Sequence, residues 1–355
     1  MRGGDSVKNT CDFLLQNAGP SIVYRVKKEV LNQLTPPEGD DLQQRILNEQ
    51  KVRQIIENAQ PDGWLGTCFH SRMRGAKHLE VCEAALSYLA EKGVELNHPV
   101  FSGVMNAYQT RSKTDPIFDG FEKTYDRYEF ACWGLWLIKA AGIARAGYED
   151  RIDISREIDL SLNSFLNVLN HDNISEVISI SKGGKHYFPY DTLWPCNYHL
   201  KILAYTQSWR TEENRVRLAK AVDRLLAMAP KDYPIYTKVE NYYAASCDAF
   251  VHAPIDSFDK SFVKGQWFDK MELFARCGIV PYSERLQHEV ALLRESIDEN
   301  GICTAIVDET YFKNWGAYSG LQLEENWRTK IKKKCDITFR ALMILTLASE
   351  YGGCG

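Results

Sequence analysis

The sequence predicts an all-α protein of about twelve helices that pair into roughly six hairpins. Three observations support this fold class. Apolar residues recur at helical spacing, helices with a polar side alternate with helices that are apolar nearly all round, and a glycine turn with an apolar residue recurs near both ends. Repetition of such a helix–turn–helix unit would build a ring or an array of helical hairpins.

The organising turn is the stretch 60–66, with the sequence QPDGWLG. Its Asp-Gly pair is typical of a turn, since glycine takes positive φ without steric cost and aspartate caps nearby backbone. A turn that carries Trp64 is expected to place that ring between the helices it joins. A weaker copy lies at 293–302, where an amphipathic helix closes with an Asn-Gly pair and an isoleucine.

Proline, glycine and capping residues bound the helices of the first third. Residues 6–33 form one or two expected helices, which a pair of prolines stops. The next helix, 40–59, starts at two aspartates that can cap it and ends at the organising turn. A helix over 74–92 has an apolar face and ends at a glycine, and a His-Pro pair opens a shorter helix after it.

The middle of the chain contains the most apolar helix. Residues 128–144 are apolar nearly all round, which predicts an inner helix, whereas 154–169 and 212–229 have a polar side and are expected outside. Residues 179–193 contain a Gly-Gly pair and indicate a short hairpin. A further helix is expected over 194–205, because its proline fits the first turn.

The pattern repeats toward the C-terminus, with a buried helix at 240–251 and a short one at 268–277. An amphipathic helix at 283–297 and a long aromatic loop at 301–330 precede a final apolar helix at 336–350. Strands are expected only as short β-hairpins in loops, so a sheet of four or more strands would contradict this fold. The alternative is an irregular α-solenoid, whose period would be more constant than these spacings of ~30–60 residues.

Composition indicates an ordinary globular chain with 45% hydrophobic and 25% charged residues. The net charge of −4 gives no basic field for nucleic acid, and no run approaches the ~18 apolar residues of a membrane span. The N-terminus has no apolar signal core, and the ten cysteines contain no C-x-x-C pair. We therefore expect reduced, mostly buried thiols in a cytoplasmic protein.

Length alone would allow two domains, but no low-complexity linker divides the chain. The prediction is one domain over 1–355, with 1–36 either part of it or an N-terminal helical extension. The expected partner is a small-molecule substrate. Oligomeric state and cofactor use stay open.

A ring of helical hairpins with such turns resembles the α/α-toroid superfamily of terpenoid cyclases and protein prenyltransferases. The residues that carry the resemblance are Gln60, Asp62, Gly63 and Trp64, with Asn300 and Gly301 as the weaker copy. The resemblance implies a toroid of helical hairpins, with an isoprenoid or another apolar small molecule bound in a central cavity. The same turn is similar to turns in (α/α)₆ glycoside hydrolases and lyases, which imply a carbohydrate substrate. A non-enzymatic toroid that binds a ligand or peptide is the third alternative.

The chain departs from the cyclase pattern in several places. That family usually has one residue between the glycine and the tryptophan, and here Gly63 and Trp64 are adjacent. The Asp-x-Asp-Asp motif of protonation-initiated cyclases, the D-D-x-x-D magnesium motif and the Asp-x-Cys zinc pattern of prenyltransferases are absent from the sequence. Each absence counts against the corresponding mechanism, and no metal ligand is assigned.

Candidate site residues are polar groups at the starts of apolar helices, because ligands of a toroid enter from those loops. The first cluster follows the organising turn and contains His70, His78 and Glu80. Histidine and glutamate near a helix start can act as acid and base. The alternative is a solvated loop with a helix cap.

The second cluster is Asp126, Arg127 and Glu129, at the start of the most apolar helix. The two carboxylates are three residues apart, so they can share one helix face and divide acid and base roles. The helix dipole would favour their charge. The alternative is an N-cap with a salt bridge to Arg127.

The third cluster runs from Tyr190 to His199. Cys196 and His199 can pair as nucleophile and base or share a metal, although two ligands alone make no metal site. The alternative is a helix start capped by Asp191, with His199 satisfied in the core.

From these clusters we expect five catalytic residues, which are Asp126, Glu129, Asp191, Tyr198 and His199. Six more are expected to bind substrate, namely His70, His78, Arg127, Trp194, Tyr190 and Tyr243. The segments 125–129 and 187–199 are expected to face the same central cavity.

Overall fold

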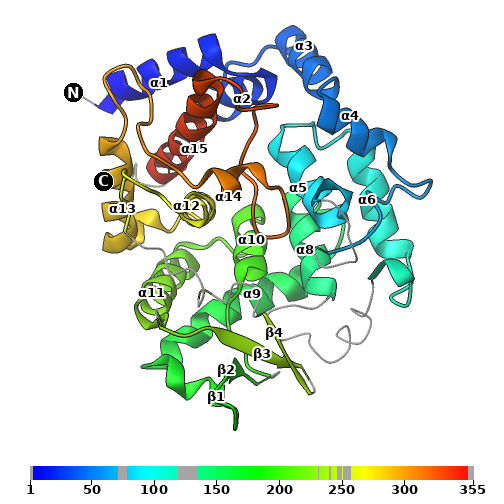
Figure 1. Ribbon diagram of the computed structural model, residues 1–355, viewed down its shortest axis with the longest axis vertical. Coiled ribbons are helices and arrows are strands. Elements are labelled where there is room, and N and C mark those ends of the chain that lie inside the picture. The colour runs from blue at the N-terminus through cyan, green and yellow to red at the C-terminus, as the bar shows by residue number, and fades with distance from the viewer. Residues whose placement is uncertain are drawn as a thin grey trace. The chain divides into compact units, whose positions relative to one another are not determined.

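The structure, a computed structural model, describes residues 3–70, 78–118, 135–189, 191–230, 232–239, 241–245, 250 and 257–350. Fourteen α-helices lie in these ranges (Figure 1), so the all-α class is confirmed. None of them combines the length and the hydropathy that a membrane span requires. Contacts divide the chain into two compact units, and the closed ring of hairpins stays a prediction.

The first unit comprises Met1–Arg111, Ser257–Glu272 and Gln287–Gly355. Its helices are α1 (Gly3–Asn17), α2 (Pro20–Arg25), α3 (Pro36–Leu47), α4 (Gln50–Glu57), α5 (Cys82–Glu91), α6 (Pro99–Thr110), α14 (Glu309–Lys313) and α15 (Lys330–Glu350). Helix α1 packs against α15, and α2 packs against α3 (Figure 1). Prolines occupy the first turns of α2, α3 and α6, where the missing N–H costs nothing.

The second unit comprises Ser112–Asp256 and Leu273–Leu286. Its helices are α8 (Leu135–Arg145), α9 (Ser155–Asn167), α10 (Asn197–Tyr205) and α11 (Glu212–Met228). Helix α10 packs against α8 and α9, and α11 packs against α9. The division between the units falls within α12 (Gly265–Arg276) and α13 (Glu284–Glu295).

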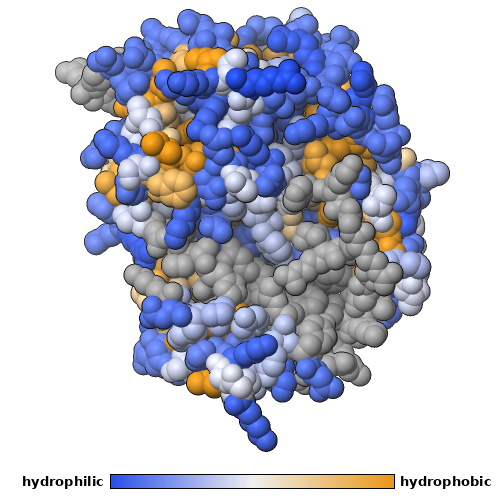
Figure 2. All heavy atoms as spheres, in the orientation of Figure 1, coloured by the Kyte–Doolittle hydropathy of each residue, from blue (hydrophilic) through white to orange (hydrophobic). Residues whose placement is uncertain are grey.

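The predicted contrast between buried helices and helices with one exposed side is confirmed for α8, α15, α9 and α11. Most side chains of α8 are buried, and every residue of α15 from Cys335 to Ile344 is buried. Helices α9 and α11 expose one side and bury the other, as their polar faces predict. Figure 2 shows mainly hydrophilic residues on the face in view, with hydrophobic residues in small separate groups.

A small sheet in the second unit differs from the prediction. Strands β1 (Ser179–Ile180) and β2 (His186–Phe188) form the expected hairpin, and β3 (Ile235–Val239) pairs with β4 (Tyr242–Ala245) in a second hairpin. Parallel pairing of β2 with β3 joins them into one four-stranded sheet. The prediction of strands only in short hairpins is therefore wrong, and a four-stranded sheet is the observation that was expected to contradict the toroid. The strands have only two to five residues, so the chain is still predominantly helical.

The bounds of two other predicted helices also differ from the structure. The buried helix expected over 240–251 is wrong in its described part, because Tyr242–Ala245 is strand β4. Adjacent tyrosines favour a strand, and pairing with β3 reinforces that preference. The single helix expected over 40–59 is two helices, α3 and α4, separated at Asn48 and Glu49.

The two glycine turns of the sequence share one backbone pattern. Gln60 N donates to Trp64 O at 2.8 Å and Gly63 N donates to Gln60 O, while Asp298 and Gly301 repeat both bonds. Both glycines have positive φ, 93° and 76°. Trp64 is fully buried, as expected, and its ring contacts Phe69 and, in α6, Tyr108. Its expected place between the two helices that the turn joins stays a prediction. The β-hairpin turn at Gly184 has the same two hydrogen bonds and positive φ, so the pattern is a general turn type and the repeat stays a prediction.

Side chains reinforce the organising turn. Arg111 donates from Nε to Asp62 at 2.5 Å and from Nη2 to Gln60 at 2.6 Å, and its guanidinium lies over the Trp64 ring. Hydrogen bonding to Arg111 lowers the pKa of Asp62. The glutamine and aspartate of the motif are therefore structural groups that hold the turn against the end of α6.

Candidate acid–base site

Several predicted site residues lie outside the described residues, namely Asp126, Arg127, Glu129 and Tyr190. The backbone of His78 belongs to a short 3₁₀ helix, His78–Glu80, and its side chain is not among those described. The expectation that 125–129 and 187–199 share a cavity therefore stays a prediction.

The start of α10 is built from predicted site residues. Trp194, Tyr198 and His199 are buried, whereas Asp191 is exposed. The N-cap of α10 is Cys196, whose backbone N–H donates to His199 Nδ1 at 3.1 Å. Within the described residues, His199 Nε2 has no hydrogen-bond partner.

Tyr243 lies on β4, on the same face of the sheet as Tyr187 and Tyr236. The Tyr187 and Tyr243 rings meet edge to face at 5.3 Å, and the ammonium group of Lys185 lies 5.1 Å from the centre of the Tyr243 ring. The structure thus places Tyr243 in an aromatic group with nearby lysines. Tyr243 belongs to the second unit and His70 to the first.

His70 belongs to a different site, which forms directly after the organising turn. Thr67 N donates to Glu80 O, Cys82 N donates to Cys68 O, and a parallel bridge joins Cys68 to Val81. These contacts align the stretch 67–69 with 80–82. The alignment carries His70 beside Glu83, in the first turn of α5.

His70 and Glu83 form a buried pair. The distance from Nδ1 of His70 to Oε2 of Glu83 is 2.7 Å, and the two residues are only 7% and 6% exposed. The carboxylate accepts only from a protonated Nδ1, which leaves Nε2 of a neutral imidazole as an acceptor. Nε2 lies 3.4 Å from the hydroxyl oxygen of Tyr318, whose ring meets the imidazole edge to face.

The loop that carries Tyr318 is anchored at both ends. Gly316 N donates to Ser319 O, and Gly320, with φ of 112°, donates its N–H to Tyr311 O. The indole of Trp315 is buried and donates to Gln322 O at 3.1 Å. These contacts hold the phenol against the imidazole.

The sequence identified His70 but missed Glu83 and Tyr318. A signal for Glu83 exists, because it is a carboxylate in the first turn of a helix with an otherwise apolar start. No sequence signal indicates Tyr318, which is 248 residues from its partner.

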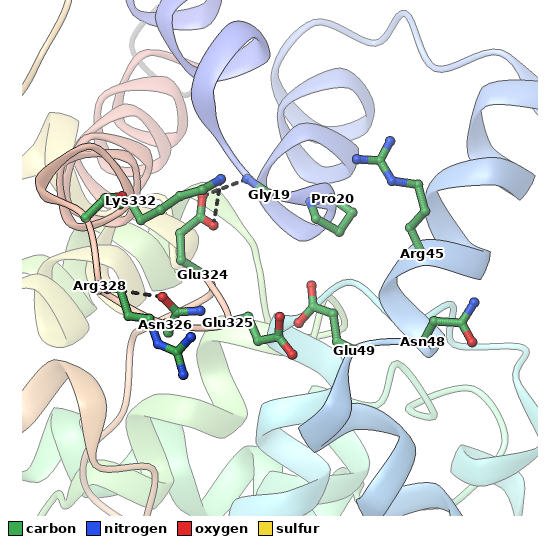
Figure 3. A pocket seen from close by; sticks show the side chains of 11 residues that line it. Gly19, Pro20, Arg45, Asn48, Glu49, Glu324, Glu325, Asn326, Arg328 and Lys332 are labelled. Carbon is green, nitrogen blue, oxygen red and sulfur yellow. Dashed lines mark hydrogen bonds and ion pairs between the residues drawn. The ribbon is translucent and has the colours of Figure 1, made fainter.

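A separate cavity of about 620 Å³ lies in the same unit (Figure 3). It is lined by Gly19 and Pro20, by Arg45, Asn48 and Glu49, and by Glu324, Glu325, Asn326, Arg328, Thr329 and Lys332. Figure 3 shows the carboxylates of Glu49 and Glu325 turned toward one another. None of these residues was predicted as a site residue.

Most charges of this cavity are already paired. Glu324 accepts from Gly19 N at 2.6 Å and lies 3.2 Å from Lys332, and Glu49 forms an ion pair with the buried Lys92. Burial raises the pKa of Glu49, and the nearby carboxylate of Glu325 adds to that rise against the opposing effect of Lys92. The cavity can hold a polar ligand, but its buried carboxylates mainly fasten helix ends.

Among the described residues, no three or more His, Cys, Asp or Glu side chains are grouped so that they could hold a metal ion. Comparison with known proteins adds no family. No family model matches the chain, and neither the curated proteins nor the solved structures contain a match. The function therefore has to be argued from the site.

Proposed function

We propose that this chain is an acid–base enzyme in which His70 transfers protons and Glu83 is its positioning residue. The observation that supports the proposal is the 2.7 Å contact between Nδ1 of His70 and the buried carboxylate of Glu83. Histidine is the commonest general acid–base group, because its pKa lies near neutrality. A carboxylate at Nδ1 fixes the tautomer and stabilises the imidazolium that forms during proton transfer.

A purely structural role explains the pair less well. A buried carboxylate is costly to desolvate, and a hydrogen bond from a neutral imidazole offsets only part of that cost. Within the described residues, Oε1 of Glu83 has no hydrogen-bond partner, which would be costly for a group that served only the core. Buried polar atoms without a partner are rare in protein cores, so this one favours a functional role for the pair.

The chemistry favours a polar substrate, so a carbohydrate-active hydrolase or lyase is our first choice. Imidazole, with a pKa of about 6.5, is suited to moving protons to and from oxygen or activated carbon. Protonation of an isolated carbon–carbon double bond requires a much stronger acid. His70 thus fits a hydrolase or lyase better than a protonation-initiated cyclase.

A terpenoid-cyclase or prenyltransferase-like enzyme is the second candidate. It is supported by the paired turns at Gly63 and Gly301, each of which lies directly against the backbone of a helix. Both candidates share the proposal that the helical hairpins close into a toroid around a central cavity. Reduced thiols at all seven described cysteines favour a cytoplasmic protein.

The test compares the wild type with His70→Ala and Glu83→Gln. Each protein is incubated with a panel of neutral and acidic polysaccharides, and released reducing ends and new conjugated double bonds are measured. Parallel incubations with isoprenyl diphosphates and squalene are analysed by mass spectrometry. Because His70 is buried, circular dichroism gives the folded fraction of each variant.

We expect polysaccharide turnover in the wild type and a loss of about 10²–10⁴-fold in His70→Ala, per folded molecule. His98→Asn is the control, because His98 caps α6 through Val100 N and should keep full activity. Turnover that survives loss of His70 would refute the acid–base proposal. Turnover of isoprenoids alone would select the second candidate, and binding without turnover would favour the non-enzymatic toroid.

A further inference from the structure

The His70 imidazole is enclosed on both sides by polar partners. Nδ1 faces Glu83 at 2.7 Å and Nε2 faces the Tyr318 hydroxyl at 3.4 Å. Both nitrogens are thereby engaged, and the ring is only 7% exposed. A substrate atom has no free imidazole nitrogen to approach in this arrangement.

Solvent exposure is lowest for Glu83 and His70 and higher for Tyr318. Glu83 and His70 are buried, whereas Tyr318 is half-buried on a loop at the surface of the unit. The phenol is thus the member of the row that a molecule from solvent reaches first.

From this geometry we infer that Tyr318 is the catalytic residue that exchanges a proton with the substrate, with His70 and Glu83 acting behind it. The inference rests on the proposed acid–base function and assigns the contact with substrate to the phenol. The sequence contains 18 tyrosines, so residue type alone did not single out this one.

The proton steps balance without any co-reactant. When Tyr318 acts as a base, its hydroxyl proton moves to Nε2 of His70 as the phenol oxygen takes a proton from the substrate. The resulting imidazolium is stabilised by the side-chain carboxyl group of Glu83, which accepts the hydrogen bond from Nδ1. When Tyr318 acts as an acid, the phenol proton goes to the substrate oxygen and the Nε2 proton returns to the phenol.

The substrate class follows from the acidity of a phenol. An ordinary tyrosine has a pKa of about 10, so it protonates a departing alkoxide oxygen far more readily than a carbon–carbon double bond. We therefore expect a substrate that releases an alcohol, as a glycosidic or other ether linkage does. An isoprenoid hydrocarbon offers no such oxygen.

The first measurement needs no substrate. Nitrogen-15 NMR of histidine-labelled protein should show His70 with its proton on Nδ1, the less common tautomer in water, and the signal missing from His70→Ala distinguishes it from His171, whose Nδ1 also faces a carboxylate, that of Glu176. Tyr318→Phe removes the donor at Nε2, so the Nε2 resonance of that histidine should shift. Tyr311→Phe is the matched control, because Tyr311 lies nearby in the chain and its hydroxyl contacts Asp269, at 3.4 Å.

The second measurement uses the polysaccharide that the wild type turns over. Tyr318→Phe should lower kcat by about 10²-fold or more with little change in KM, while Tyr311→Phe keeps wild-type values. Full activity in Tyr318→Phe together with inactive His70→Ala would overturn this inference and leave the acid–base function standing. If Tyr318→Phe and His70→Ala both keep full activity, the inference and the acid–base function are both overturned. A His70 that carries its proton on Nε2 would also overturn the inference.

Discussion

Single buried charges hold the first unit together. Arg340 is 1% exposed, and its Nη1 lies 2.8 Å from Glu91 and 2.9 Å from Glu272. Arg25 reaches the same Glu91 carboxylate at 2.7 Å. The network links α2, α5, α12 and α15, so each charge depends on partners from distant parts of the chain.

Arg340→Ala should therefore lower the free energy of unfolding by about 3–5 kcal/mol, because it removes the buried arginine that Glu91 and Glu272 share. Arg53→Ala is the control. Arg53 is more than half exposed and lies 3.7 Å from Glu57, so its loss should cost less than about 1 kcal/mol. Urea denaturation measures both values. Equal losses in the two variants would contradict the importance of the buried network.

Asp336 is the second buried charge with a clear role. Its Oδ1 accepts from Leu323 N at 2.6 Å, and its Oδ2 accepts from the Trp327 indole at 2.5 Å. Burial raises the pKa of Asp336 to about 7, although these donors lower it. The residue fastens the loop before α15.

This raised pKa predicts a pH dependence of stability. The folded state binds the Asp336 proton more tightly than the unfolded state, so the contribution is full below pH ~4 and is lost as pH rises through ~7. The effect can reach a few kcal/mol, since one pKa unit corresponds to about 1.4 kcal/mol. Denaturation with guanidinium between pH 4 and 8 should show a flatter profile for Asp336→Asn than for the wild type.

The control for that profile is Asp153→Asn. Asp153 is exposed and binds Ser155, and those hydrogen bonds lower its pKa. Its substitution should leave the slope between pH 4 and 8 unchanged. An identical profile for wild type and Asp336→Asn would exclude Asp336 as the source of the dependence.

At the scale of elements, the glycine turns dock on helix backbones. A Cβ on Gly63 would lie 2.4 Å from the backbone of Gly103 in α6, and a Cβ on Gly301 would lie 2.3 Å from the backbone of Thr10 in α1. The turn at Gly184 has the same hydrogen bonds and positive φ, but a Cβ there meets nothing within 4 Å.

Substitutions at these three glycines distinguish the cost of a left-handed backbone from the cost of displacing a neighbouring helix. Gly184→Ala should cost about 1 kcal/mol, from the left-handed backbone alone. Gly63→Ala and Gly301→Ala should cost about 2–4 kcal/mol each, because the added carbon also displaces a helix backbone. Thermal unfolding followed by circular dichroism ranks the variants. Similar losses at all three positions would show that the close packing contributes nothing.

At the scale of the whole molecule, the reactivity of the cysteine thiols depends on whether the protein is folded. Seven of the ten cysteines lie in the described ranges, and all seven are free and buried. Burial raises the pKa of the Cys82, Cys277 and Cys335 thiols to about 12 and that of Cys11 to about 11. The predicted reduced, buried thiols are confirmed for these residues.

A disulfide reagent such as DTNB should thus modify no more than three thiols rapidly in the native protein at pH 8, and all ten after unfolding. The thiolate is the reacting form, and burial suppresses both its formation and its access. Counting the released chromophore gives the result. Rapid reaction of more than three thiols would show that the buried cysteines become accessible without unfolding.

The sequence by itself determined the features that depend on neighbours a few residues apart. It predicted the helical class, the inner α8, the turn at 60–66 and the burial of Trp64, because helical periodicity and turn chemistry act locally. It failed at β4, where pairing with β3 favoured a strand in a stretch that looked like a buried helix.

Only the tertiary structure decided how the distant pieces meet. It joined β2 to β3 in parallel, it paired Arg340 with Glu91 across 249 residues, and it set Tyr318 against His70 across 248. No local pattern encodes such contacts, because they arise only when whole helices pack and bury their apolar faces. Of the three residues of the candidate acid–base site, the sequence therefore predicted only His70, whose place after the turn is a local feature.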